Sequence, residues 1–102
     1  MNRQEAMKEP VRVLQWGMTD GLGGLETFMM NVYRHIDRSK VQFDFLLPHD
    51  AAPLVFEHEI EQLGGRIFRV MYPERESMIK ARSSLVQFYR AHPEYRILHV
   101  NA

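Results

Sequence analysis

The chain has 102 residues, of which 45% are hydrophobic and 25% charged, an ordinary composition for one small globular domain. Its 13 basic and 13 acidic side chains cancel, so the strongly basic surface that binds nucleic acids is excluded. Because the chain has no cysteine, disulfides, thiolate nucleophiles and cysteine-ligated metal centres are excluded as well.

Residues 1–10 are expected to form a polar arm, because they lack the hydrophobic stretch of a signal peptide. No apolar run elsewhere in the chain approaches the roughly 20 residues that a membrane span requires. Together with the lack of cysteine, these features favour a cytoplasmic location.

The first expected element is a strand that leads through a glycine-rich turn into a helix. Val11–Trp16 is short, apolar and bounded by Pro10 and Gly17, which is typical of a strand buried on both faces of a parallel sheet. Residues 17–24 then turn the chain. A glycine-rich turn before a helix leaves backbone N–H groups free where the helix dipole favours negative charge. The turn therefore predicts an anion site.

The helix after this turn has the clearest periodicity in the sequence. Its apolar residues recur at spacings of three and four, which predicts one helix face lying on a sheet. These residues are Leu25, Phe28, Met29, Val32, Tyr33 and Ile36. We expect Met29 and its neighbour Met30 to be core residues rather than part of a binding surface.

A second strand is expected at Val41–Leu47, where Pro48 stops it and a solvated turn at His49 and Asp50 follows. A second helix should begin at Pro53 and end at the glycine pair 64–65 in a left-handed stop. Its buried face would carry Phe56, Ile60 and Leu63, and its solvated side Glu57, Glu59 and Glu61.

The third expected strand, Arg66–Met71, contains two arginines, which indicate an edge position. After a loop at residues 72–76, Ser77 is placed to cap a third helix that Pro93 ends. Its apolar stripe is Met78, Ala81, Leu85, Phe88 and Tyr89. Tyr95–Val100 is expected to be the fourth strand.

Strands that alternate with helices predict an α/β fold, a Rossmann-like doubly wound parallel sheet with strand order 3-2-1-4. Ligands of such sheets bind beyond the carboxyl ends of the strands, between the first and the fourth. The glycine turn and Asn101 should both lie there. The fourth strand would have an uncovered apolar edge, so we expect the fold to be incomplete at the C-terminus and the chain to be the front part of a longer protein.

Four segments resemble the N-terminal region of family 4 glycosyltransferases in order and spacing. They are Gly23–Val32, Asp37–Phe45, Glu61–Ile67 and Ile97–Asn101. The resemblance covers nearly everything from Val11 onward. It implies that residues 11–102 are the Rossmann-like, acceptor-side part of an enzyme with the two-domain GT-B architecture.

Members of this family move a sugar from a nucleotide-sugar donor to a glycan or lipid-linked acceptor, as in the synthesis of polysaccharides. The resemblance implies no bound metal and no cofactor, because the nucleotide sugar is a co-substrate. It also implies peripheral membrane association through the full-length protein. Gly23 and Gly24 would bind the donor phosphate through their N–H groups. Gly21, His99 and Asn101 would contact the substrate, and no catalytic residue is named.

The sequence departs from the family in two ways. The fourth strand of the family often ends in His-x-His, whereas here Asn101 follows His99 and Val100. Asparagine can bind a sugar hydroxyl but cannot take up a proton. The donor-binding C-terminal domain is also missing, so the chain alone is expected to be inactive.

Several of these residues also have structural interpretations. The glycines can form a tight connection without a ligand, and Glu26 can simply satisfy the dipole of the helix. His99 is expected to be a hydrogen-bonded core histidine, while Asn101 faces the cleft. Trp16 and Met18 can pack in the core or on a ligand.

Two other classes of function remain as alternatives. A nucleotide- or dinucleotide-binding module shares the architecture, but Glu26 stands where the fingerprint needs its third glycine and the second strand ends without a ribose-binding acid. A receiver-like or flavodoxin-like binding module would need an acidic cluster after the first strand. Only Asp20 is present there.

Overall fold

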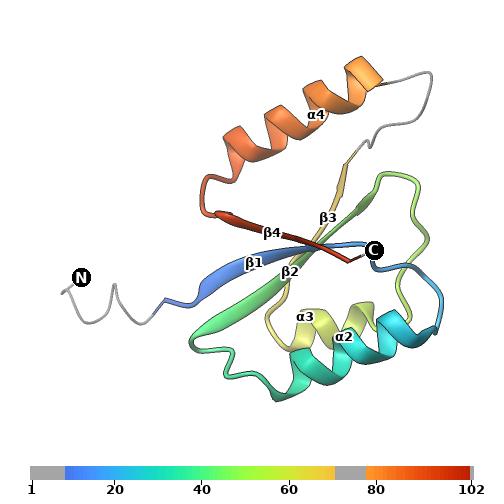
Figure 1. Ribbon diagram of the computed structural model, residues 1–102, viewed down its shortest axis with the longest axis vertical. Coiled ribbons are helices and arrows are strands. Elements are labelled where there is room, and N and C mark those ends of the chain that lie inside the picture. The colour runs from blue at the N-terminus through green and yellow to red at the C-terminus, as the bar shows by residue number, and fades with distance from the viewer. Residues whose placement is uncertain (1–8, 71–77, 102) are drawn as a thin grey trace.

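The computed structural model describes residues 9–70 and 78–101. Its elements alternate along the chain in the order β1 (Val11–Trp16), α2 (Gly24–His35), β2 (Val41–Pro48), α3 (Glu57–Gln62), β3 (Ile67–Val70), α4 (Met78–Ala91) and β4 (Ile97–Val100). The strands form one parallel sheet in the order β3-β2-β1-β4, as predicted. Helices α2 and α3 cover one face of the sheet and α4 covers the other (Figure 1).

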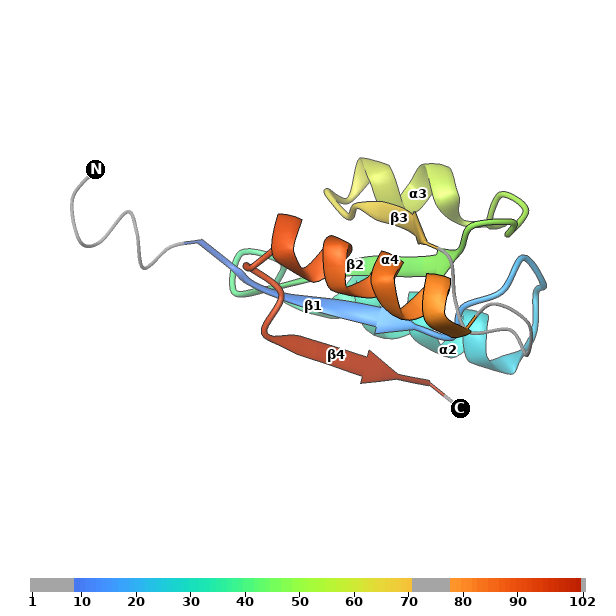
Figure 2. The same ribbon diagram turned by 90° about the horizontal axis from the view of Figure 1, so that it is seen from above.

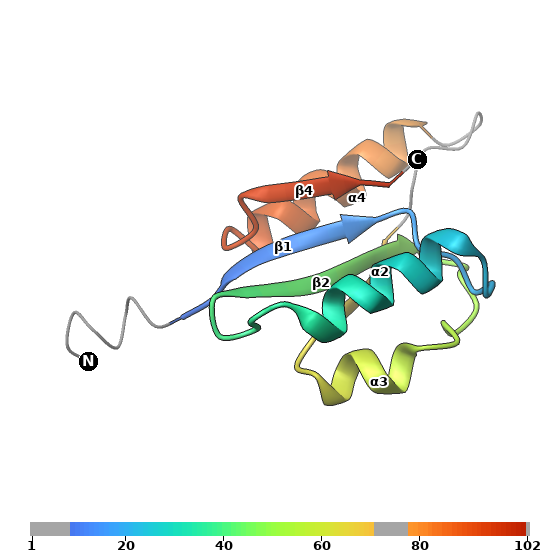
Figure 3. The ribbon, with the colours of Figure 1, turned by 60° about the horizontal axis from the view of Figure 1, so that its bottom comes forward.

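The strand order places the switch point between β1 and β4. Strand β1 pairs with β2 along its whole length and with β4 on its other side, where Val13 lies opposite Ile97. The arrowheads of β1, β2 and β4 point to the same end of the sheet (Figure 3). The turn that leads from β1 into α2 begins at this end, so the glycines lie where the topology predicts a ligand.

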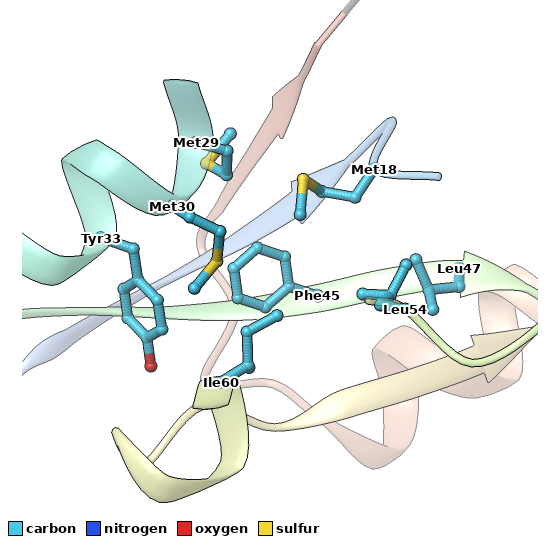
Figure 4. Packing of buried hydrophobic residues seen from close by; sticks show 8 residues of the cluster. All are labelled: Met18, Met29, Met30, Tyr33, Phe45, Leu47, Leu54 and Ile60. Carbon is cyan, nitrogen blue, oxygen red and sulfur yellow. The ribbon is translucent and has the colours of Figure 1, made fainter. Parts of the chain in front are cut away.

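A first hydrophobic cluster fills the space between the sheet and the two helices α2 and α3 (Figure 4). Its buried members are Met18, Met29, Met30, Tyr33, Phe45, Leu47, Leu54 and Ile60. The core positions predicted for Met29 and Met30 are confirmed, since they are 3% and 0% exposed. Met18 also belongs to this cluster, which agrees with its core interpretation.

The buried face of α2 is rotated relative to the predicted stripe. Phe28 is 65% exposed, and the face is formed by Glu26, Met29, Met30 and Tyr33. The placement of Phe28 in the core was therefore wrong. Spacings of three and four fit both sets of residues, and the packing of Met30 in the cluster with Phe45 selects the second set.

A second cluster lies on the opposite face, between the sheet and α4. It contains Leu14, Leu46, Val70, Phe88 and Tyr95, with Trp16, Phe68, Leu85 and Tyr89 packed against it. The predicted stripe of α4 is confirmed at Leu85, Phe88 and Tyr89. The structure describes neither the side chains of Met78 and Ala81 nor the predicted loop and cap at residues 72–77. Tyr95 precedes β4 instead of belonging to it, because its ring packs in this core.

Helix α3 begins later than predicted, at Glu57 instead of Pro53. Leu54 is only 5% exposed, and its N–H donates to Glu57 Oε1 at 3.3 Å. The segment before the helix is thus held outside it because Leu54 packs in the core. The predicted stop is confirmed, since Gly64 has a φ of +91° and the N–H of Gly65 reaches the Ile60 carbonyl at 2.9 Å.

Two of the glutamates assigned to the solvated side of α3 form ion pairs instead. Glu57 binds Arg69 of β3 at 2.8 Å, and Glu59 binds Arg34 of α2 through both of its carboxylate oxygens. Hydrogen bonds from these arginines lower the pKa of each glutamate. Strand β3 does lie at the edge of the sheet, as its arginines indicated. One of them, Arg69, also links β3 to α3 through Glu57.

Asp44 of β2 is fully buried and is the centre of a polar network on the α4 side. Both of its carboxylate oxygens accept from Arg12 Nη1 at 2.9 Å. The backbone N–H of Arg66 donates to it at 2.7 Å, and so does the Tyr95 hydroxyl. The network joins β1, β2 and the segments before β3 and β4. A buried carboxylate is stable only with such partners.

Buried tyrosines make the fold sensitive to alkali. Burial and the nearby Asp44 carboxylate raise the pKa of Tyr33 to about 12, and burial with the hydrogen bond to Asp44 raises the pKa of Tyr95. Both exceed the value of about 10 in an unfolded chain. The native state thus holds these protons more tightly, so their stabilisation is complete below pH 10 and is lost as the pH rises toward 12.

Tyr33→Phe is therefore expected to flatten this alkaline loss of stability. At pH 7 the change should cost about 1 kcal/mol, because the hydroxyl of Tyr33 donates to Gln42 Oε1 at 2.6 Å. Urea unfolding at several pH values between 7 and 12 measures both effects. An equal slope in the variant and the wild type would show that Tyr33 does not contribute.

Candidate functional site

The carboxyl ends of β1 and β4 are in direct contact at the switch point. The N–H of Asn101 donates to the Trp16 carbonyl at 2.8 Å. Gly17 has a φ of +116°, and a Cβ built on it would lie 2.3 Å from the Asn101 carbonyl oxygen. Only glycine fits this close approach. Sequence reasoning treated Gly17 as a strand boundary and did not foresee this contact, which depends on the pairing of β1 with β4.

The glycine predicted to contact the substrate, Gly21, and the two predicted to bind the donor phosphate, Gly23 and Gly24, differ in how their N–H groups are used. The N–H of Gly21 donates to Thr19 Oγ1 at 3.2 Å, and that of Gly23 donates to Glu26 Oε1 at 3.0 Å. Gly24 has no hydrogen-bond partner for its N–H in the part of the chain that the structure describes. Gly24 is exposed, and a Cβ on it would meet nothing within 4 Å.

Glu26 is held inside the turn. It is 5% exposed, and its second carboxylate oxygen accepts from the backbone N–H of Thr19 at 3.4 Å. The carboxylate thus joins two parts of the turn to the first turn of α2 and satisfies N–H groups that no helix bond reaches. This agrees with the structural interpretation of Glu26, and of the three glycines it leaves Gly24 with an N–H that no described group binds.

A polar cluster links the two strand ends on the face that carries α2. Gln15 is 2% exposed, and its Oε1 accepts from Asn101 Nδ2 at 3.1 Å and contacts His99 Nδ1 at 2.8 Å. Asn101 Nδ2 also donates to the Trp16 carbonyl at 2.9 Å. Sequence reasoning missed Gln15, although a glutamine among apolar strand residues is itself an unusual signal.

His99 is hydrogen-bonded, as expected, but the prediction of a core position was wrong. Its side chain is exposed, because β4 lies at the outer edge of the sheet (Figure 2). The apolar residues around it are exposed as well, by 47% at Ile97, 45% at Leu98 and 57% at Val100. The uncovered apolar edge that the sequence predicted is therefore present in the described residues.

The other predicted candidates have structural surroundings. Trp16 is half-buried and packs against the α4-side cluster. His49 and Asp50 are exposed in a turn after β2, which agrees with a solvated turn. Two apolar side chains flank the glycine turn on its outside, since Leu22 is 67% and Phe28 65% exposed.

The arrangement provides hydrogen-bonding groups and no cluster of metal ligands. Within residues 9–70 and 78–101, no three histidine, aspartate or glutamate side chains lie together in a way that could hold a metal ion. The open groups among the described residues are the N–H of Gly24, the ring of His99 and the amide oxygen of Asn101. Such groups can bind an anion and neighbouring hydroxyls. Over the same residues, no helix has the length and apolarity needed to cross a membrane.

Comparison with known proteins gives one local similarity. A segment of 48 residues is 54% identical to a Bacillus subtilis (strain 168) protein named "Putative glycosyltransferase EpsF". The segment makes up 47% of this chain and 12% of that protein, so the match spans about an eighth of its length. No family model and no solved structure matches the chain. The chain thus contains a region that is similar to part of a protein named as a glycosyltransferase.

Proposed function

We propose that residues 11–102 are the acceptor-side, Rossmann-like part of a family 4 glycosyltransferase with GT-B architecture. The observation that carries this proposal is the 54% local identity to a protein named as a glycosyltransferase. The observed strand order supports it, because it brings the glycine turn and Asn101 to the same switch point. The reaction is transfer of a sugar from a nucleotide-sugar donor to a glycan or lipid-linked acceptor in the cytoplasm.

Gly24 is the residue best placed to bind the donor phosphate. Its exposed N–H lies at the first position of the 12-residue helix α2, where the helix dipole adds to the attraction for an anion. As the sugar leaves, negative charge builds up on the diphosphate, and a fixed N–H donor stabilises that charge. Gly23 contributes its N–H only if the carboxylate of Glu26 moves away from it.

Exposed His99 and half-buried Asn101 would bind hydroxyl groups of the substrate on the other side of the switch point. Asn101 cannot exchange a proton, so its role is limited to hydrogen bonding. The group that binds the nucleotide belongs to a second domain in our proposal. The chain alone is therefore expected to bind a donor weakly and to transfer nothing.

Gly24→Ala is expected to weaken nucleotide-sugar binding about tenfold, because a methyl group at this position obstructs the N–H donor. The fold should be unaffected, since the added Cβ meets nothing within 4 Å. Titration of the ¹⁵N-labelled chain with UDP-, GDP-, ADP- and dTDP-sugars measures the affinity through amide shifts. Circular dichroism of the variant provides the control for folding. Equal affinity in variant and wild type would remove Gly24 from the site.

Transfer itself requires an assay of the longest natural protein that contains this segment. We expect release of nucleoside diphosphate from at least one donor of the same panel when glycan and lipid-linked acceptors are supplied. No release from any donor would count heavily against the glycosyltransferase proposal. Nucleotide binding without release would favour a binding module.

A further inference from the structure

In the hydrogen-bond network around Gln15, the donor and the acceptor of each bond can be assigned in turn, starting from the Trp16 backbone carbonyl. The Trp16 carbonyl oxygen can only accept, so the Asn101 atom 2.9 Å from it must be the amide nitrogen Nδ2. The same nitrogen lies 3.1 Å from the side chain of Gln15. Since Nδ2 donates, the Gln15 atom that faces it must be the oxygen Oε1. The orientation of both amides follows from one carbonyl group.

This orientation also determines which ring nitrogen of His99 carries the hydrogen. His99 Nδ1 lies 2.8 Å from the same Gln15 Oε1, which has only lone pairs to offer. Nδ1 must therefore donate, and in the neutral ring Nε2 is left without a hydrogen. Nε2 has no hydrogen-bond partner among the described residues, and the side chain of His99 is exposed. The ring thus offers a hydrogen-bond acceptor at the switch point.

The position of Gln15 suits this role. Gln15 lies directly opposite His99 in the pairing of β1 with β4, so both side chains project from the same face of the sheet. Gln15 is 2% exposed, so its amide has lost its hydrogen bonds to water, and burial is favourable only because bonds within the protein replace them. Rigid strands on both sides hold the three residues in place. The buried Gln15 amide therefore has a fixed orientation, and it restricts the His99 ring more than hydrogen bonds to water would.

We propose that Gln15 is a positioning residue that holds His99 in the Nδ1–H tautomer, so that Nε2 accepts a hydrogen bond from a hydroxyl group of the substrate. The hydrogen bond from Asn101 Nδ2 to Gln15 Oε1 prevents the Gln15 amide from rotating. The neutral ring then favours ligands with hydroxyl groups over ligands that present only carbonyl or phosphate oxygens at this point. The identification of the hydroxyl as part of a sugar rests on the proposed function.

The tautomer can be measured in the free chain by two-bond ¹H–¹⁵N spectra of the imidazole rings. The measurement is made at alkaline pH, where histidine rings in general are neutral. The chain has 5 histidines, and the signal missing from His99→Gln identifies His99. We expect Nδ1–H to dominate in the wild type. Gln15→Leu should shift the tautomer ratio roughly fivefold toward Nε2–H, because one hydrogen bond is lost.

Two further variants make the test decisive. Asn101→Ala removes the hydrogen bond that fixes the Gln15 amide, directly after β4, and should shift the ratio in the same direction even if Gln15→Leu fails to fold. Gln87→Leu makes the same change at an exposed glutamine of α4 and should leave the ratio unchanged. An Nε2–H ring in the wild type, or an unchanged ratio in both Gln15→Leu and Asn101→Ala, would overturn the proposal. No sugar is present, so the outcome is independent of whether the protein transfers one.

Discussion

Replacement of Gly17 by alanine is expected to lower the free energy of unfolding by about 3 kcal/mol. Two effects act together at this position. The φ of +116° is strained for any residue with a Cβ, and the added carbon would lie 2.3 Å from the Asn101 carbonyl oxygen. The contact is with backbone, which cannot rotate away as a side chain does. Relief requires that the end of β4 separate from β1.

Urea unfolding of Gly17→Ala measures this loss, and Gly24→Ala is the matched control. The same methyl group at Gly24 meets nothing within 4 Å, and alanine favours a helix over glycine by up to about 1 kcal/mol. The control should therefore be as stable as the wild type or slightly more stable. Loss of the Asn101 amide resonance from its native position in Gly17→Ala would locate the damage. Equal stability of the two variants would contradict the close approach.

Asp44→Asn is expected to destabilise the protein by about 3 to 5 kcal/mol, the cost of breaking a buried ion pair. The fully buried carboxylate accepts hydrogen bonds from Arg12, from the backbone of Arg66 and from the Tyr95 hydroxyl. An amide at this position has one oxygen for these donors and adds two N–H groups of its own. The guanidinium of Arg12 would lose its counter-charge in a half-buried position.

Two further variants distinguish the loss of the Asp44 hydrogen-bond network from the general effect of removing a charged side chain. Glu59→Gln removes one partner of the exposed pair between α3 and α2, and should cost less than about 1 kcal/mol. Combining Asp44→Asn with Arg12→Met removes the unpaired guanidinium and should recover part of the loss. Chemical denaturation measures all of these changes. Additive losses in the double variant would show that Arg12 and Asp44 do not interact.

The fold was predictable from the sequence because it depends on local patterns. Apolar runs bounded by glycine and proline mark the strands, and the three- and four-residue spacing marks α2 and α4. Which residues of a helix are buried depends on its neighbours. Phe28 and Met30 fit helical spacing equally well, and the start of α3 depends on how Leu54 packs. These details come from tertiary contacts that no local pattern contains.

The site was predictable in its location but not in its contacts. A glycine turn between a strand and a helix indicates a site wherever it occurs, whereas the capture of the Gly23 N–H by Glu26 depends on the conformation of the turn. Gln15 and His99 are far apart in the sequence and meet only through the register of β1 and β4. The exposure of His99 follows from the outer position of β4, which is a property of the whole sheet.

The pairing of β1 with β4 has a consequence for how the protein is made. The side chain of Asn101 binds the Trp16 carbonyl across a separation of 85 residues. During synthesis, the first strand is complete long before its outer partner exists. Such distant contacts form late, because a long loop must close first. Strand β4 therefore joins β1 and forms the polar cluster of Gln15, His99 and Asn101 in one step, after the glycine turn has already been synthesised.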